Sequence, residues 1–486
     1  MATPNDKWFL GFALAGYILT MWPVQGQDLP QFGPAYQRFE LTLTPGERTE
    51  AVGPFYSLEY QERHRTLTLA PVYSEERDPD TDSIWVDIAY PFLSYRRFGG
   101  EYRFQFFQLL SFAGGQNQDA GGTKRFTLFP LYFQQRSTDT NENYTAFLPF
   151  YGHLKDRLFR DEVDFFMFPF YVRTRKKDIV TENYLAPFYH RRHGLGLTGW
   201  QLWPFIGKEH KDLTTITNRY DELVTVGGHD KLFVLWPFYF RNQLGIGTTN
   251  PVSQRAMFPF FSLTRSPLRD STTYLWPLGV TVTDDREKRF HEVDAPWPLV
   301  VFAHGEGKTT HRVWPFFSQA HTEFLESDFY LWPLFKFNRA HSDPLDRTRT
   351  RLLYFVWSDI KQTNTETGKS LRRRDLWPLY TGRTDFNGNS RHQVLALLEP
   401  LFPNNRSIER DFAPVWSLWR AERNPGTGAA SQSLLWNLYR RETSPEGKKF
   451  SLLFGLIRYQ SDANGSQWRW FFIPSHKSKN HVPERR

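Results

Sequence analysis

Short apolar runs recur along most of the chain, each about five residues long and bounded by polar residues. The string "FYLWPLFKF", residues 329–337, is typical, with Pro333 at its centre. Similar strings, among them "LFPLY", "MFPFY", "LWPFI" and "LWPLY", recur with a period of about 19 residues, which indicates a repeat architecture. The consensus is Φ-[WF]-P-[LF]-[FY], and about 22 units are present when variants without proline are included.

The segments between the runs carry turn signals. "DTNEN", "NGNS", "PGTG" and "PEGK" contain the Asn and Gly residues that tolerate a positive φ in hairpin loops. A helical interpretation fails, because a proline inside a helix costs about 3 kcal/mol and most of the runs contain one. The pattern therefore predicts an all-β fold. We expect an antiparallel meander of about 22 repeated strands, each about 10–13 residues long, that forms a large closed barrel or a barrel-like, toroidal sheet.

The proline in each run should lie in the middle of a strand. Because side chains alternate between the two faces of a strand, Leu331, Pro333 and Phe335 would share one face, and Trp332 and Leu334 the other. Both faces are then apolar, which predicts a sheet covered on both sides at this level, with a bulge shared by all strands. The motif residues expected to carry this structural role are Trp203, Pro204, Trp236, Pro237, Trp276, Pro277, Trp314, Pro315, Trp332, Pro333, Trp377 and Pro378.

The ends of the chain differ from the repeats. An apolar run follows Lys7 and precedes a polar segment, which is typical of a secretory signal. We expect residues 1–26 to be a signal peptide, or else a retained N-terminal anchor, since about 17 apolar residues is the lower limit for a spanning helix. Residues 27–50 would form an N-terminal extension, 51–475 the β-repeat array and 476–486 a basic C-terminal tail. Export to the outer membrane, the periplasm or the surface of a bacterium follows from the signal.

Composition narrows the possible partners. The chain contains no cysteine, which excludes disulfides and thiolate chemistry. Its formal net charge is +8, and aromatic residues make up 17% of it. A basic protein can bind nucleic acid, but an exported one meets anionic lipid or lipopolysaccharide first. We therefore expect an anionic lipid, lipopolysaccharide or an apolar ligand as partner, and no nucleic acid.

Few residues suggest chemistry. Asp78, Asp80 and Asp82 stand at alternate positions in "DPDTDS", a pattern that can hold calcium, although a polar turn explains it as well. Glu399 occupies a motif position where other units carry Trp or Phe, so it is expected at the rim or paired with an Arg of a neighbouring strand. No nucleophile elbow, phosphate loop or dinucleotide fingerprint is present, so no catalytic residue and no cofactor is predicted.

These observations favour a non-enzymatic cell-envelope protein that acts as a scaffold or binds apolar ligands or lipid. An outer-membrane β-barrel pore or transporter is the first alternative, supported by the export signal and the even strand count. The mid-run prolines and the short apolar band argue against it. A secreted glycan-binding protein is the second alternative, and it is weaker because each Trp lies at the apolar centre of its unit.

Overall fold

The computed structural model describes residues 35–117, 121–217, 220–463, 465–471 and 473–474. The expected signal segment, residues 1–26, and the basic tail, residues 476–486, lie outside the described residues. The described part of the expected N-terminal extension forms β1 (Gln37–Glu40) and most of β2 (Glu47–Ala51), and β2 pairs with the first strand of the array.

One antiparallel sheet of 43 strands contains almost all of the described chain, which confirms the predicted all-β meander. Successive strands of this sheet pair in chain order, as β2 to β6 do, and β19 pairs with β22. β20 (Thr214–Thr217) and β21 (Leu223–Val226) form a separate hairpin. The first half of the sheet is made of β3 (Tyr56–Gln61), β4 (His64–Leu69), β5 (Tyr73–Asp78), β6 (Ser83–Ile88), β7 (Leu93–Phe98), β8 (Glu101–Phe106), β9 (Leu110–Asn117), β10 (Gly121–Leu128), β11 (Tyr132–Arg136), β12 (Tyr144–Phe147), β13 (Tyr151–Arg157), β14 (Arg160–Phe166), β15 (Tyr171–Lys176), β16 (Ile179–Tyr184), β17 (Tyr189–Gly194), β18 (Leu197–Leu202), β19 (Ile206–Lys211), β22 (Gly228–Val234), β23 (Tyr239–Ile246), β24 (Val252–Met257) and β25 (Phe261–Arg265).

The second half of the sheet contains one helical insertion. Residues 395–418 separate two neighbouring strands and include α2 (Arg406–Asp411) and α3 (Ala413–Trp416). Short 3₁₀ turns, η2 (Gly53–Phe55) and η3 (Thr140–Glu142), complete the helical elements of the described residues. The strands of this half are β26 (Arg269–Tyr274), β27 (Val280–Asp285), β28 (Phe290–Asp294), β29 (Val300–Gly305), β30 (Lys308–Val313), β31 (Phe317–Thr322), β32 (Leu325–Tyr330), β33 (Phe335–Ser342), β34 (Leu345–Leu352), β35 (Trp357–Asn364), β36 (Ser370–Leu376), β37 (Tyr380–Thr384), β38 (Ser390–Val394), β39 (Trp419–Asn424), β40 (Ala429–Leu434), β41 (Tyr439–Ser444), β42 (Gly447–Leu452), β43 (Ile457–Asp462), β44 (Gly465–Trp470) and β45 (Ile473–Pro474).

The repeat unit is a hairpin and not a single long strand. The expectation of about 22 long strands is therefore wrong, because each unit of about 19 residues holds two strands of mostly six residues. The aromatic-proline motif forms the tight turn between two strands, as residues 331–334 do between β32 and β33. Pro333 follows a cis peptide bond, as do most of the motif prolines. No bulge in mid-strand is needed, since a turn has no ladder hydrogen bond for proline to remove.

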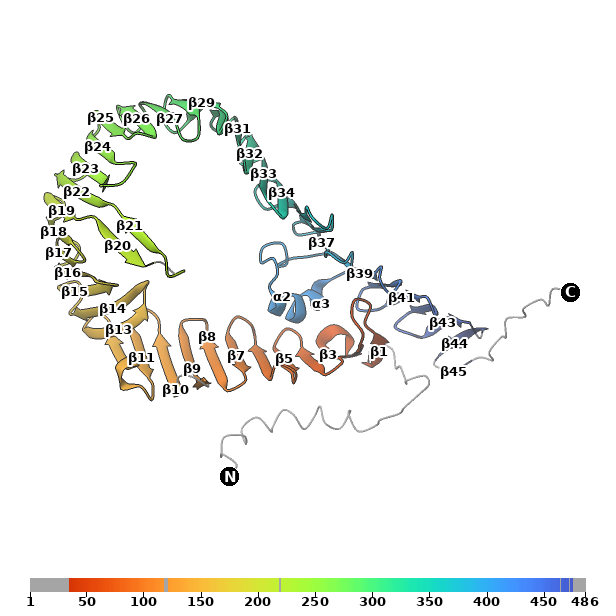
Figure 1. Ribbon diagram of the computed structural model, residues 1–486. Helices are drawn as coiled ribbons and strands as arrows, with labels where there is room; N and C mark the ends of the chain where they lie inside the picture. The colour runs from red at the N-terminus through yellow and green to blue at the C-terminus, as the bar shows by residue number, and fades with distance from the viewer. Residues whose placement is uncertain (1–34, 118–120, 218–219, 464, 472, 475–486) are drawn as a thin grey trace.

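The strip of strands curves through most of a ring, with α2, α3 and the β20–β21 hairpin inside the curve (Figure 1). Within the described residues, β1 pairs only with β2 and β45 only with β44, so hydrogen bonds between the first and last strands do not close the sheet. The two ends instead meet through side chains where β39–β41 reach β1–β3, and the strands after β41 continue past that point (Figure 1).

The helical insertion docks on the concave face of β5 and β6. The Arg410 guanidinium donates hydrogen bonds to Asp87 Oδ2 at 2.7 Å and to Glu76 Oε2 at 3.2 Å. Ser74 Oγ donates to Asp411 Oδ2 at 3.0 Å, and Ser407 Oγ donates to Asp87 Oδ2 at 2.6 Å. These contacts join segments more than 300 residues apart along the chain, and they define the face of the sheet that lies inside the ring.

Among the described residues, buried apolar side chains form a packed cluster in one stretch of the ring. Ala146 and Leu154 are fully buried, and they pack with Phe133, Val163 and Phe165 on the concave face of β11–β14. Most other side chains remain partly exposed, because the sheet is a single layer over much of its length (Figure 1). The expectation that apolar residues would be shielded on both faces is therefore wrong.

Candidate functional site

All motif turns lie along one border of the sheet, which we call the apolar edge. They share a border because each repeat is a two-strand hairpin, so successive motif turns follow every second strand. Neighbouring turns are joined by main-chain hydrogen bonds. The Leu331 and Trp332 amides donate to the carbonyl oxygens of Phe316 and Pro315, at 2.5 and 2.8 Å. The Trp236 amide donates to the carbonyl oxygen of Pro204 at 2.7 Å in the same way.

Aromatic rings of neighbouring turns on the apolar edge contact each other in tilted pairs, and most are half-exposed. Ring centroids lie 6.2 Å apart for Trp203 and Trp236, and 6.2 Å apart for Trp314 and Trp332. Trp332 keeps 46% of its surface exposed, and Trp276, Trp236 and Trp314 are exposed to a similar degree, whereas Trp203 and Trp377 are more buried. The residue after proline is more exposed still. Highly exposed examples at this position are Phe238 (58%), Phe260 (59%), Leu278 (61%) and Phe316 (60%).

The convex face continues this apolar surface. The residues that flank most motif turns are apolar and pair with one another, as Tyr171 does with Tyr184 and Phe335 with Leu352. They point to the convex face, because the next residue inward along the strand, as at Ser74 and Asp87, is the one that meets the insertion on the concave face. Tyr184 and Leu352 are 43% and 42% exposed. The apolar edge and this row together form a band along the sheet, with charged residues farther from the edge. Sequence analysis found these residues but placed them in a covered core.

The concave face carries a basic cluster close to the apolar edge. Arg347, Arg349 and Arg351 alternate along β34 and therefore share one face, and Arg351 lies directly opposite Lys336 of β33. Arg312 of β30 stands in the same row as Lys336. None of the five forms an ion pair with a described carboxylate. Burial, followed by repulsion from Arg351, lowers the pKa of both Lys336 and Arg349.

The opposite border of the sheet is polar and holds the predicted calcium candidates. Asp78 Oδ1 accepts the amide of Asp80 at 2.9 Å, and its other oxygen accepts the Thr81 hydroxyl at 2.9 Å. These hydrogen bonds lower the pKa of Asp78, the bond from Thr81 contributing most. Arg97 contacts Asp82 at 2.7 Å. Among the described residues, no group of three or more His, Asp or Glu side chains is arranged to hold a metal ion.

Glu399 is placed by the helical insertion and not by a strand. It is 2% exposed, and its carboxylate accepts hydrogen bonds from Gln393 at 2.7 Å and from the Trp416 indole at 3.1 Å. Arg373 contacts its carbonyl oxygen at 2.6 Å. Pro400 and Pro414 also lie in this insertion, where Pro414 is in the first turn of α3, so these two motif copies do not form strand units. Glu399 thus helps to fold the insertion.

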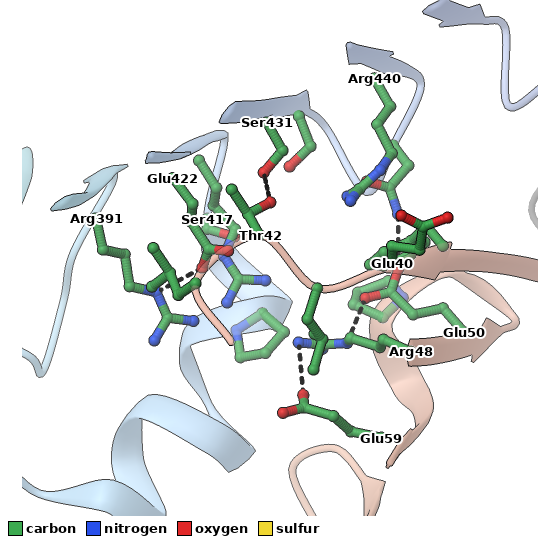
Figure 2. Close-up of a pocket in the computed structure, with 18 of the residues that line it drawn as sticks. Glu40, Thr42, Arg48, Glu50, Glu59, Arg391, Ser417, Glu422, Ser431 and Arg440 are labelled. Carbon is green, nitrogen blue, oxygen red and sulfur yellow. Dashed lines mark hydrogen bonds and ion pairs between the residues drawn. The ribbon is translucent and has the colours of Figure 1, made fainter. Parts of the chain in front are cut away.

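A cavity of about 220 Å³ lies where the two ends of the sheet meet (Figure 2). β2 and β3 supply Arg48, Glu50 and Glu59, and β38 and β39 supply Arg391 and Glu422. Ion pairs join Arg48 to Glu50 at 3.0 Å and Arg391 to Glu422 at 3.2 Å. Burial opposes ionisation of both Glu422 and Arg48. The pKa of Glu422 is nevertheless lowered by Arg391, and that of Arg48 raised by Glu50.

Two hydrogen bonds cross between the ends of the sheet beside this cavity. Thr42 Oγ1 donates to Ser431 Oγ at 2.6 Å, and Asn437 Nδ2 donates to Glu50 Oε2 at 2.7 Å. Figure 2 shows Thr42 and Ser431 on facing segments. The sequence contains no signal for this meeting point, because it depends on how far the sheet curves over its whole length.

Comparison with known protein families finds no matching family model, and comparison with curated proteins finds no match. No helix among the described residues is long and apolar enough to span a membrane.

Proposed function

We propose that the protein is a non-enzymatic scaffold of the bacterial cell envelope that binds a lipid surface through its apolar edge. The observation that carries the proposal is the exposure of Trp, Phe and Leu in successive turns along one border of the sheet. The largest apolar patch on a typical soluble monomer covers roughly 300–600 Å². An aromatic side chain buries about 150–250 Å², so half-exposed residues from even a dozen turns exceed that area.

The composition of the edge suits the boundary between water and acyl chains. Trp and Tyr concentrate at membrane interfaces, because each has an apolar body and a polar group that remains hydrated. The basic cluster of Arg312, Lys336, Arg347, Arg349 and Arg351 lies beside the edge on the concave face, at a level that lipid headgroups would occupy. Unpaired cations near a membrane surface contribute about 1 kcal/mol each toward binding anionic lipid. Phospholipid or lipopolysaccharide phosphates would therefore be favoured over neutral headgroups.

The curved sheet provides the scaffold. We propose that it works as a toroid whose ends are held together by side chains, so that its whole apolar edge can meet one lipid surface. An outer-membrane pore or transporter is the alternative function. Strands of six residues are shorter than the roughly 9–11 residues that cross a bilayer, and we therefore prefer binding at the surface. Glycan binding by the exposed Trp side chains remains the third candidate.

Vesicle flotation tests lipid binding. In the edge variant, Phe238, Phe260, Leu278 and Phe316 are all replaced by Ser, which keeps every Trp and removes four highly exposed side chains at the position after proline. Burying a large apolar side chain stabilises by about 1.5–3 kcal/mol, and these four are roughly 60% exposed, so binding should weaken at least tenfold. The wild-type protein should float with mixed vesicles of phosphatidylglycerol and phosphatidylcholine. A smaller fraction of it should float with vesicles of pure phosphatidylcholine.

A matched control carries the same substitutions on the polar border. Phe98, Phe159, Phe324 and Leu325 are 65%, 97%, 56% and 57% exposed and lie at or beside turns of the opposite border. Replacing these four by Ser removes three Phe and one Leu, as in the edge variant. The proposal requires this control to float like the wild type. Equal loss in both variants, or no flotation of the wild type, would show that the apolar edge does not bind lipid.

A further inference from the structure

Arg420 lines the cavity between the ends of the sheet without a partner among the residues that the structure describes. The cavity is lined by Glu40, Glu50, Glu59 and Glu422, and each of these carboxylates pairs with a cation other than Arg420, Glu50 and Glu59 both with Arg48. In the described residues, neither a hydrogen bond nor an ion pair reaches the Arg420 side chain. The nearby cations are engaged elsewhere, as Arg440 is with Glu442 at 2.6 Å.

Two unpartnered hydroxyl groups line the same cavity. Ser433 lies directly opposite Arg420 in the pairing of β39 with β40, so the two side chains are neighbours on one face. Ser417 is 4% exposed, and its hydroxyl makes no hydrogen bond with a described residue. It lies among the cavity residues that Figure 2 draws as sticks. A guanidinium and two hydroxyls thus provide donors without acceptors.

We propose that this cavity binds a phosphate-type oxyanion on Arg420, Ser417 and Ser433. A tetrahedral oxyanion can accept hydrogen bonds from a guanidinium and from several hydroxyls at once, and Arg is well suited to phosphate geometry. The cavity, at about 220 Å³, has room for such a group. The proposal does not depend on lipid binding by the apolar edge.

The electrostatics of the cavity agree with this assignment. Burial, followed by repulsion from Arg391 and Arg48, lowers the pKa of Arg420 to about 9. Glu422 and Glu50 attract Arg420 only from a distance. Arg420 is half-buried, and a partly desolvated charge without a counter-ion is destabilising, so a bound anion would offset that penalty. Since β2–β3 and β38–β40 both line the cavity, the anion would also tie the two ends of the ring together.

Thermal unfolding of the full chain at pH 7 tests the site. Inorganic phosphate should raise the melting temperature of the wild type by several degrees beyond sodium chloride of equal ionic strength, because a ligand that binds only the folded protein stabilises it. In Arg420→Gln the phosphate effect should disappear. In phosphate-free buffer this variant should melt at or above the wild-type temperature, because Arg420 has no counter-ion there. If Arg420 belonged to a structural ion pair, its replacement would instead lower the melting temperature. Arg441→Gln is the control, since Arg441 is exposed on the other face of β41.

A second probe distinguishes free phosphate from a lipid headgroup. Vesicles containing phosphatidylglycerol are added in phosphate-free buffer to the wild type and to Arg420→Gln. If inorganic phosphate raises the melting temperature and Arg420→Gln abolishes this rise, the site binds the free anion. If only vesicles raise the melting temperature and Arg420→Gln abolishes that rise, the site binds a phospholipid headgroup. Equal responses of the wild type and Arg420→Gln to both probes, or no response to either, would overturn the proposal.

Discussion

Arg410 should control whether the helical insertion stays docked inside the ring. Its guanidinium is 14% exposed and contacts Asp87 and Asp411, whose side chains are 4% and 3% exposed. Replacing Arg410 by Met keeps much of the volume but leaves two buried carboxylates facing each other. Removing one partner of a buried ion pair costs about 3–5 kcal/mol. Because about 1.4 kcal/mol corresponds to a factor of ten, local opening should increase by two to three orders of magnitude.

Hydrogen exchange of the amides in residues 406–416 measures this opening directly. Arg406→Met is the matched control on the same helix, because the Arg406 side chain is 75% exposed and lies 3.9 Å from Glu76. An exposed pair of this kind contributes about 0–1 kcal/mol, so exchange should change less than tenfold. If Arg410→Met and Arg406→Met exchange at the same rate, the docking contacts described above do not hold the insertion.

The effect of Arg410→Met should depend on pH. Burial already raises the pKa of Asp411, and Arg410 opposes that rise. Without Arg410 the pKa of Asp411 should rise further. Between the ordinary pKa of Asp and this raised value, the Asp411 carboxyl keeps its proton in the folded protein and loses it in the unfolded chain. Stability then falls as pH increases above about 4, the ordinary value for Asp. The variant should therefore exchange faster relative to the wild type at pH 7 than at pH 4, and the opposite trend would contradict this assignment.

Three further predictions concern other parts of the ring. Because the chain has no cysteine, the double variant Thr42→Cys, Ser431→Cys should form one intramolecular disulfide under mild oxidation, seen as faster migration in a denaturing gel without reducing agent. Failure to form this disulfide would mean that the two ends of the sheet do not meet. Burial, with a smaller contribution from Glu292, raises the pKa of Asp294 to about 6, so the stability of the folded protein should fall as pH rises from about 4 to 6. Asp294→Asn should therefore raise the melting temperature at pH 8 and leave it unchanged below pH 4. Leu154 is fully buried, so Leu154→Ala should destabilise its part of the sheet by about 2–5 kcal/mol, measured by hydrogen exchange of β13 and β14.

The sequence predicted the strand type and the repeat period because apolar runs and turn residues alternate at a fixed spacing. It misplaced Pro333 because a period of about 19 residues fits one long strand or one short hairpin equally well. In the short hairpin the strands are polar, as "LDRTRTRL" of β34 is, and their alternation is weak because one layer of sheet buries little. The apolar run then belongs to the turn, where ring contacts with the next turn favour Trp and Phe.

The motif residues of the candidate site could be chosen from the sequence, but their exposure could not. Pairing of an acid with a base across a hairpin was predictable for Asp164 and Arg173, which stand directly opposite each other. The partners of Arg410 and the isolation of Arg420 were not, because both depend on contacts between segments more than 300 residues apart. Only the loss of the motif pattern around Glu399 marked this region as different.

The depth of the motif tryptophans at a lipid surface shows whether the apolar edge inserts into it. Tryptophan emission is measured with aqueous iodide and with lipids brominated along the acyl chain, using vesicles that contain phosphatidylglycerol. We expect iodide to quench the free protein efficiently, and vesicles to protect the tryptophans from iodide while brominated chains quench them. Iodide quenching that vesicles do not change, with no quenching by brominated chains, would contradict insertion of the apolar edge.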